Sequence, residues 1–466
     1  MDGLRMCALE RFHRQLAARS CCDLAGVLGG LLPKREFAEL TQAGTRQRVF
    51  TPVTAFWHFL TQILSPNQSC REVVRRVQAQ RQQCRRSPIS PRTGAYCQAR
   101  QRLPVSVLKR LWQRLADHLA GSAAPDLLWE GFRVAVIDGT TVSMPDTPAN
   151  QRLWPQPANQ RPGCGFPILK LVAVFSLATG AIHAVITGSM HRAEHALLQG
   201  LWPCLQVGFD LLLGDRNFGS YATFCELRLR RMHGVFRLHQ GRRMDWRTGQ
   251  RLGPHDRLVV WRRPVKLPPT CRRPSLPETV TVRVLRVQLD VPGFRTQPLC
   301  LATDLTYPRR YSPEALARLY FLRWSVELFF AHIKTAMHMD VLRCQTPAMI
   351  RRELHMHFIA YNAIRAVMIE AAARANVGLD RVSFKGTCDA LRQFAPHLAA
   401  LSNHPPAYRR LMRLFLDTLA TDLVPLRRPR SEPRVLKRRP KNFHRLTKPR
   451  HLMGNLSHRN RPKPER

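Results

Sequence analysis

The first 125 residues carry apolar side chains at helical spacing. The segments 53–64, 69–78 and 104–119 repeat an apolar residue every three or four positions, as helices with one buried face do. Arginines are expected on their exposed faces: Arg71, Arg75, Arg76, Arg100, Arg102 and Arg110. The pattern predicts an all-α N-terminal domain over residues 1–125.

From Phe132 the pattern becomes mixed α/β over 126–237. FRVAVIDGTTVSM and DLLLGDRNFG are apolar strands that run into an acid, GVFRL is a third strand, and helices are expected at 194–201 and 221–230. The apolar run 169–186 is long enough to suggest a membrane span. Thr179 and Gly180 interrupt it and His183 follows, so two buried strands joined by a tight turn explain it better.

The second half of the chain divides into three further segments. Residues 238–300 alternate as strands in RLVVWRRP and TVTVRVLRV, and predict a β-rich insertion. Helices resume over 301–424, where Ser312 is the expected N-cap and Pro313 the first helical residue. Residues 425–466 are basic and rich in proline, and we expect this tail to be disordered until it meets a polyanion.

The charge points to a polyanionic partner. Seventy-four Lys and Arg against 31 Asp and Glu give a formal net charge of +43, which favours nucleic acid over a membrane surface because no apolar anchor is evident. The short basic helix expected in SPRTGAYCQARQRLP is either a DNA-reading helix or a solvated basic face. No signal peptide is recognised, and thirteen scattered cysteines without a C-x-x-C pair suggest reduced thiols, so we expect a cytoplasmic protein.

Three carboxylates are candidates for one site. Asp138 and Asp215 each end a predicted strand, at the sheet edge where ligands usually bind, although a lone acid there is often only a helix cap. Glu327 lies in YFLRWSVELFFAHIKTAMHMD, which predicts a single helix. Tyr320, Arg323, Glu327 and Lys334 follow one another there at intervals of three, four and seven residues, so they share roughly a 60° arc of that helix. The alternative is an ordinary solvated face with an Arg–Glu pair.

These motifs resemble those of the DDE transposases of bacterial insertion sequences, and within them the insertion-sequence-four family with its Y-x2-R-x3-E-x6-K signature. All four signature positions are filled, and DGT at Asp138 and DRNFG at Asp215 match the other two catalytic neighbourhoods. The resemblance implies an RNase-H-like mixed sheet flanked by helices and interrupted by the β-rich insertion. It also implies Asp138, Asp215 and Glu327 as catalytic metal ligands for Mg²⁺, with Mn²⁺ able to substitute.

The resemblance further implies how the protein would act on double-stranded DNA. A homodimer in a synaptic complex would cut and join the terminal inverted repeats and then attack target DNA, near the bacterial nucleoid. Tyr320, Arg323 and Lys334 would contact this DNA. Trp261, with Trp246 in reserve, would stack on a flipped base, or else Trp261 is a core residue.

Two other interpretations remain open from the sequence. A catalytically silent or domesticated copy would bind DNA with the same fold, and an RNase-H-like nuclease would act alone. His191 and His195 in HRAEH are spaced like metal ligands but lack the H-E-x-x-H order.

Overall fold

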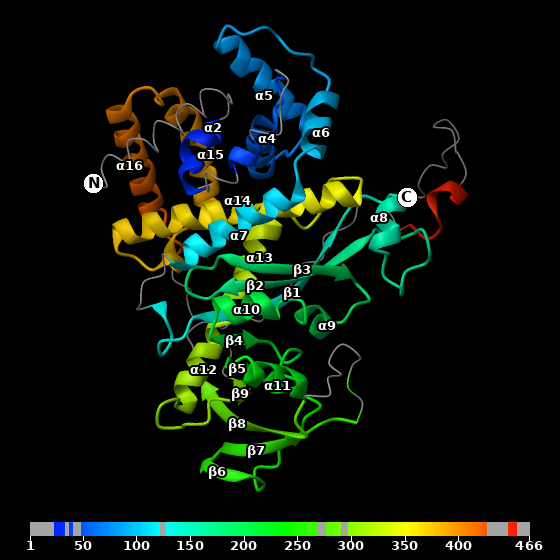
Figure 1. Ribbon diagram of the computed structural model, residues 1–466, viewed down its shortest axis with the longest axis vertical. Helices are drawn as coiled ribbons and strands as arrows, with labels where there is room; N and C mark the ends of the chain where they lie inside the picture. The colour runs from blue at the N-terminus through cyan, green and yellow to red at the C-terminus, as the bar shows by residue number, and fades with distance from the viewer. Residues whose placement is uncertain are drawn as a thin grey trace, which may run out of the picture.

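The computed structural model of the protein describes residues 23–32, 37–40, 48–121, 127–265, 267, 276–289, 297–425 and 446–453. The basic tail predicted over 425–466 lies outside these residues except for 425 and 446–453. Two parts are visible in Figure 1, a helical part and a sheet.

The strands form one nine-stranded sheet in the order β3-β2-β1-β4-β5-β9-β8-β7-β6. β1 (Val134–Ser143) pairs antiparallel with β2 (Ile168–Ser176), which pairs antiparallel with β3 (Ile182–Ser189). On the other side of β1, β4 (Leu211–Gly214) and β5 (His233–Arg237) run parallel to it. This arrangement of the first five strands is RNase-H-like, as the resemblance implied.

The β-rich insertion continues this sheet. β6 (Gln250–Gly253), β7 (Asp256–Arg262), β8 (Thr279–Leu289) and β9 (Gln297–Thr303) are antiparallel to one another, and β9 pairs with β5. Figure 1 shows the resulting single sheet running from β3 beside the helical part to β6 at the far end of the molecule. The inserted strands are therefore fixed to β5, and through it to the first five strands, by backbone hydrogen bonds.

Both faces of the sheet are buried, because successive side chains of each strand point into cores on opposite sides. Val134 and Val136 of β1 pack with α12 (Pro313–Leu322), α13 (Ser325–Ala331) and α14 (Pro347–Ala375). Ala135 and Ile137 point the other way, into a core with α9 (Glu194–Leu198), α10 (Trp202–Gly208) and α11 (Tyr221–Leu229). Because side chains alternate along a strand, Asp138 belongs to the α12–α14 side.

The helical part is built around α14, which lies beside α7 (Val105–Gly121) across the molecule (Figure 1). α4 (Pro52–Leu64), α15 (Phe384–Ala400) and α16 (Pro405–Thr421) contact α14, and α2 (Asp23–Leu28) contacts α15. α8 (Pro148–Leu153) lies beyond the end of β1. Helices at the predicted places 53–64, 69–78 and 104–119 are confirmed, and so is the Ser312 cap, whose oxygen accepts from the Ala315 amide.

α14 holds the turn between β2 and β3. Asn362 accepts a hydrogen bond from the Ile182 amide at 2.9 Å and donates one to the Ile182 carbonyl at 3.0 Å. Arg365 donates to the Thr179 carbonyl at 2.8 Å, and its guanidinium occupies the space that a Cβ at Gly180 would need. Gly180 also has a positive φ of 66°, which glycine adopts without strain. The apolar run 169–186 is thus a hairpin, as predicted.

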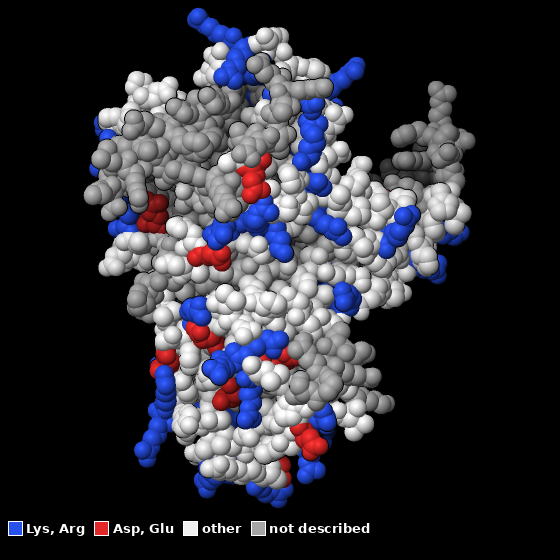
Figure 2. Space-filling view, viewed as in Figure 1, with Lys and Arg blue, Asp and Glu red and all other residues white. Residues whose placement is uncertain are grey.

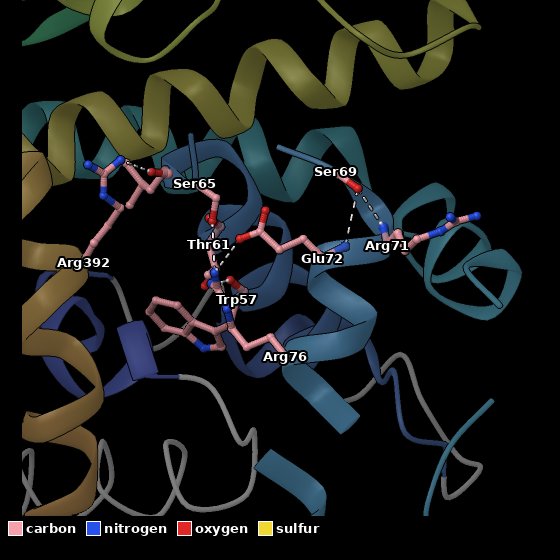
Figure 3. Close-up of polar contacts among 9 residues, drawn as sticks. Trp57, Thr61, Ser65, Ser69, Arg71, Glu72, Arg76 and Arg392 are labelled. Carbon is pink, nitrogen blue, oxygen red and sulfur yellow. Dashed lines mark hydrogen bonds and ion pairs between the residues drawn. The ribbon is translucent and has the colours of Figure 1, made fainter. Parts of the chain in front are cut away.

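Side-chain hydrogen bonds join the end of α4 to the start of α5 (Cys70–Gln83), as Figure 3 shows. Ser69 caps α5 by accepting from the amides of Arg71 and Glu72. Arg76 donates to Glu72 at 2.9 Å and to Ser65 at 3.3 Å, so its charge is partly engaged within the helical part. The Arg71 side chain extends away from these contacts in Figure 3 and is exposed, in keeping with the expected basic face.

Candidate functional site

Asp138 and Asp215 lie side by side at the centre of the sheet. Ile137 of β1 is in register with Gly214 of β4, so the two aspartates follow on neighbouring parallel strands, which are about 4.8 Å apart in a sheet. Asp138 accepts from the Gly139 amide at 2.7 Å, and Asp215 from the Asn217 amide at 2.8 Å. β1 continues past Asp138 to Ser143, so the expectation that Asp138 ends its strand is wrong, because the antiparallel pairing with β2 carries β1 further.

Burial raises the pKa of Asp138 to about 6. The hydrogen bond from Gly139 and the charge of Arg323 oppose this rise, whereas the charges of Asp215 and Glu194 add to it. Negative charge is therefore concentrated where it is poorly solvated, and a cation beside these carboxylates would stabilise their ionised form.

Arg323 connects two of the three predicted carboxylates. Its guanidinium lies 3.6 Å from Asp138 and 3.7 Å from Glu327, and the residue is 8% exposed. Tyr320 is 3% exposed and its ring centroid lies 5.6 Å from the same guanidinium. Both side chains were expected to contact DNA. The structure buries both where this helix packs on the sheet, with Arg323 beside Asp138 and Glu327, and their contact with DNA stays a prediction.

The expected single helix is also divided. The amides of Arg323, Trp324, Val326 and Glu327 bond to carbonyls three residues back, which tightens the backbone between α12 and α13. A π-helical turn, His332–Ala336, then widens it. These changes alter the rotation per residue. Tyr320 and Glu327 consequently do not share one uniform face: the first is buried and the second exposed.

Lys334 reaches the same region from this π-helical turn. Its Nζ donates to the Thr140 hydroxyl at 3.1 Å, and Thr140 is two residues beyond Asp138 on the same side of β1. The helix therefore contributes a carboxylate, a buried cation and a half-buried cation to the surroundings of Asp138.

Glu194 was not predicted as part of the site. It begins α9 on the opposite side of the sheet, and its carboxylate oxygen lies 2.4 Å from where a Cβ at Gly139 would be. Burial is the main cause that raises its pKa, and the charge of Asp215 adds to it, while a hydrogen bond with Asn217 opposes the rise. In the sequence, Glu194 is the acid between the two histidines of HRAEH, and no motif there marks it as part of this site.

Trp261 is not available as an exposed stacking surface. It is 6% exposed, packs edge-on against Phe224 and has the Arg242 guanidinium 3.8 Å from its ring centroid. β7 turns this side chain into the core shared with α11, so the core interpretation is the one that the structure supports. Trp246 is half-buried and contacts His255.

The arrangement of possible metal ligands is looser than the sequence suggested. Among the described residues, no three His, Cys, Asp or Glu side chains lie close enough to hold a metal ion as they stand, and this includes His191 and His195. Glu327 is exposed and directed to Arg323 rather than meeting the two aspartates.

Comparison with known proteins identifies the family. The model of the transposase DDE domain matches residues 129–363, just over half of the chain, and spans β1 to α14. The chain belongs to the DDE transposases. It is 29% identical over 354 residues to the transposase InsG for insertion sequence element IS4 of Escherichia coli (strain K12), which covers 74% of this chain and 77% of that protein. The relationship supports the insertion-sequence-four family that the signature residues suggested.

A solved structure is also similar. The piggyBac transposase synaptic complex with hairpin DNA aligns with 87% of this chain and 84% of that one, at a TM-score of 0.41 and 9% identity. As a DDE transposase, the protein is an enzyme that cleaves DNA and transfers strands. Within the part of the chain that the structure describes, no helix is long and apolar enough to cross a membrane.

Proposed function

We propose that this transposase cuts and joins the ends of an insertion sequence with Asp138, Asp215 and Glu327 as its catalytic carboxylates. The observation that carries the proposal is the adjacency of Asp138 and Asp215 on paired parallel strands, with Arg323 joining Asp138 to Glu327. The three carboxylates come from the three neighbourhoods that resemble the catalytic motifs of the family, which supports this assignment.

The carboxylates fit a hard divalent cation. Their donors are all oxygen, which Mg²⁺ and Mn²⁺ prefer, and the crowding of negative charge at Asp138 calls for a positive counter-charge. Asp138 and Asp215 would hold the ion, with Glu327 completing the set from α13. When bound, such ions activate an attacking hydroxyl and stabilise the leaving oxygen of a phosphodiester. DDE transposases are generally dependent on a divalent metal.

The side chains of the protein orient the reacting DNA. Arg323 keeps Asp138 and Glu327 on the same side of the sheet, and Lys334, beside Thr140, is placed to pair with a phosphate oxygen of the bound end. Water attacks the phosphorus at the end, the bond to the 3′ oxygen breaks, and the freed 3′-hydroxyl attacks the next phosphodiester. Arg323, which is buried, acts through the carboxylates.

The charge of the whole chain supports the proposed partners. Lys and Arg side chains are spread over the helical part and the sheet on the face seen in Figure 2, with fewer acidic ones between them. We assign end recognition to the N-terminal helices, sequence-independent phosphate binding to the basic tail, and the paired ends to a homodimer acting on terminal inverted repeats and target DNA. The expected location is the bacterial cytoplasm, at the nucleoid.

Replacing Asp138 by Ala tests the catalytic assignment. The variant should lose DNA cleavage and strand transfer in Mg²⁺ and in Mn²⁺ while binding the end as tightly as wild type, because the carboxylate and the phosphate contacts have separate roles. Cleavage would be followed on labelled DNA that carries the sequences flanking the reading frame, and binding by mobility shift.

Asp245→Ala is the matched control, since Asp245 is an exposed aspartate on the inserted segment. It should cut normally. An Asp138→Ala protein that still cuts would remove Asp138 from the mechanism. Wild-type protein that binds the end without cutting it in either metal would point to a catalytically silent copy.

A further inference from the structure

A cavity remote from the carboxylates is lined by three thiols and a buried cation. It has a volume of about 380 Å³ and lies where α4, α5 and α6 (Gly94–Gln101) meet residues 343–346 and α14. Cys70, Cys97 and Cys344 line it together with Arg100. Cys70 and Cys97 are half-buried, so small molecules from solvent can reach them. The cysteines that the structure describes are all free thiols.

Arg100 was expected on an exposed basic face, but it is 8% exposed because α6 turns it toward α4. The Gln62 side-chain oxygen accepts from Arg100 at 3.3 Å and from the Tyr96 hydroxyl at 2.8 Å. The guanidinium also lies over the rings of Phe59 and Tyr96, at 4.9 and 5.1 Å from their centroids. Its position is therefore fixed on several sides.

The charge of Arg100 lacks a carboxylate partner. Glu353 also lines the cavity, but its carboxylate accepts from the Arg343 and Cys344 amides and forms no ion pair with Arg100. Among the described residues, the buried Nε of Arg100 has no hydrogen-bond partner. Its Nη2 instead lies 3.2 Å from the Cys70 sulfur and 3.7 Å from the Cys97 sulfur. A buried cation is costly unless an anion lies beside it, and the cavity offers two candidates: the Glu353 carboxylate, which interacts with Arg100 without an ion-pair contact, and a thiolate at the sulfurs that do contact the guanidinium.

The two sulfurs divide the roles between them. The Cys70 thiol donates a hydrogen bond to the Cys97 sulfur. That bond lowers the pKa of Cys97 to about 5, with Arg100 contributing and burial opposing, and it raises the pKa of Cys70. Burial raises the pKa of Cys344. Cys97 is thus the thiolate of the cavity, and Cys70 is the thiol that already contacts it.

We propose that Cys70 and Cys97 are a peroxide-reactive thiol pair that closes to a disulfide between α5 and α6. The site is distinct from the DNA-cleaving carboxylates, and its ligand class is a small hydroperoxide. The structural basis is the contact of both sulfurs with one buried guanidinium, which has no ion-pair contact among the described residues, at the wall of an accessible cavity.

The reaction balances with hydrogen peroxide as the oxidant. The Cys97 thiolate attacks one peroxide oxygen, the O–O bond breaks, and hydroxide leaves, so that Cys97 becomes a sulfenic acid. The Cys70 sulfur then attacks the Cys97 sulfur and displaces its hydroxyl, which leaves as water with the Cys70 proton. Two thiols are oxidised and one peroxide is reduced to two waters overall.

Peptide mapping of the full-length, reduced protein tests this. After treatment with an equal amount of hydrogen peroxide at pH 7, remaining thiols are alkylated and the protein is digested without reductant. We expect a linked pair of peptides containing Cys70 and Cys97, lighter by two hydrogens than the two reduced peptides and separated by dithiothreitol. Before oxidation, Cys97 should be alkylated about tenfold faster than Cys84, because it is ionised at this pH.

Two variants serve as matched controls. Cys84, exposed at the end of α5, and Cys344, in the same cavity, should each be replaceable by Ser without loss of the linked peptides, whereas Cys97→Ser should abolish them. Cys84 reacting first, a sulfinic acid at Cys97 without a disulfide, or a bond from Cys97 to Cys344 would each overturn the proposal. The map of the wild-type protein decides the matter even where a variant is unstable.

Discussion

At position 139, one added methyl group would meet the Glu194 carboxylate. A Cβ there would lie 2.4 Å from a Glu194 oxygen, and no real Cβ contact is that short. Gly139→Ala should therefore displace the carboxylate at the end of the flexible Glu194 side chain, whose charge acts on Asp138. We expect the rate of DNA cleavage to fall about tenfold or more, because displacements of about 1 Å near a reacting centre have large effects. Cleavage kinetics at saturating metal would measure this.

A double variant tests whether contact with Glu194 is what slows cleavage in Gly139→Ala. If the collision with Glu194 is the cause, the double variant Gly139→Ala/Glu194→Ala should cut DNA faster than the product of the two single-variant effects predicts. Gly208→Ala, where a Cβ meets nothing within 4 Å, is the control for a general glycine effect. Independent, multiplying effects of the two substitutions would contradict the contact.

At the scale of single residues, short motifs point to most of the residues around Asp138, whereas the contacts between them depend on tertiary packing. Asp138, Asp215 and Glu327 were recognisable because short motifs surround each. Arg323 was expected to contact DNA because of the family resemblance, and its burial beside two carboxylates depends on how the helix packs on the sheet, which the motif does not encode. Glu194 could not be connected to Gly139, because the closeness of α9 to β1 depends on tertiary packing.

Among the elements, β7 and β8 of the insertion share a buried ion pair. Arg283 is fully buried and donates to Asp256 at 2.6 Å, and it also donates to the carbonyls of Leu305 and Tyr311, which precede α12. Asp256→Asn would leave Arg283 buried without its anion. We expect a loss of roughly 3–5 kcal/mol in the free energy of unfolding, measured by denaturant titration.

Asp245→Asn is the comparison for this pair. Asp245 also pairs with an arginine, Arg247, but the two side chains are 51% and 93% exposed. The unfolding midpoint of this variant should not move, since exposed pairs are screened by solvent. Equal effects at both positions would mean that the Arg283 pair contributes nothing through its burial.

The elements were predictable to different degrees. The strands, the β2–β3 hairpin and the Ser312 cap followed from apolar alternation and turn residues. The division of 320–334 into α12, α13 and a π-helical turn did not, because no Gly or Pro marks it. Phe329 and Phe330 pack there against Phe175 of the sheet, and a helical repeat alone does not encode this packing.

For the whole molecule, buried histidines predict sensitivity to acid. Burial lowers the pKa of His357 to about 3, and that of His58, His183 and His332 to about 4. Each stays neutral in the fold and takes up a proton on unfolding below its ordinary value of about 6.5. Stability is therefore fully present above pH 6.5 and is lost as the pH falls toward 4, by about 1.4 kcal/mol per pH unit for each histidine.

His357→Leu should reduce this dependence by about one proton, because His357 is fully buried and neither of its ring nitrogens has a hydrogen-bond partner among the described residues. Urea titrations between pH 4.5 and 6.5 would give the slope. His191→Leu, at an exposed position, should leave the slope unchanged. A slope unaffected by His357→Leu would show that this ring is not kept neutral by the fold.

The pairing of β9 with β5 has a consequence for how copies of the insertion-sequence gene lose their activity by mutation. In the described sheet β5 has β4 on one side and β9 on the other, and its β9 partners are residues 301–303, so a gene deletion that removes 238–303 would strip one side of β5. Val235 and Phe236, both fully buried, would then border an open strand edge that can pair with other chains. Shortened copies of this kind should accumulate as aggregates. A catalytically silent copy that still folds and binds DNA should arise more readily by point substitution at the carboxylates.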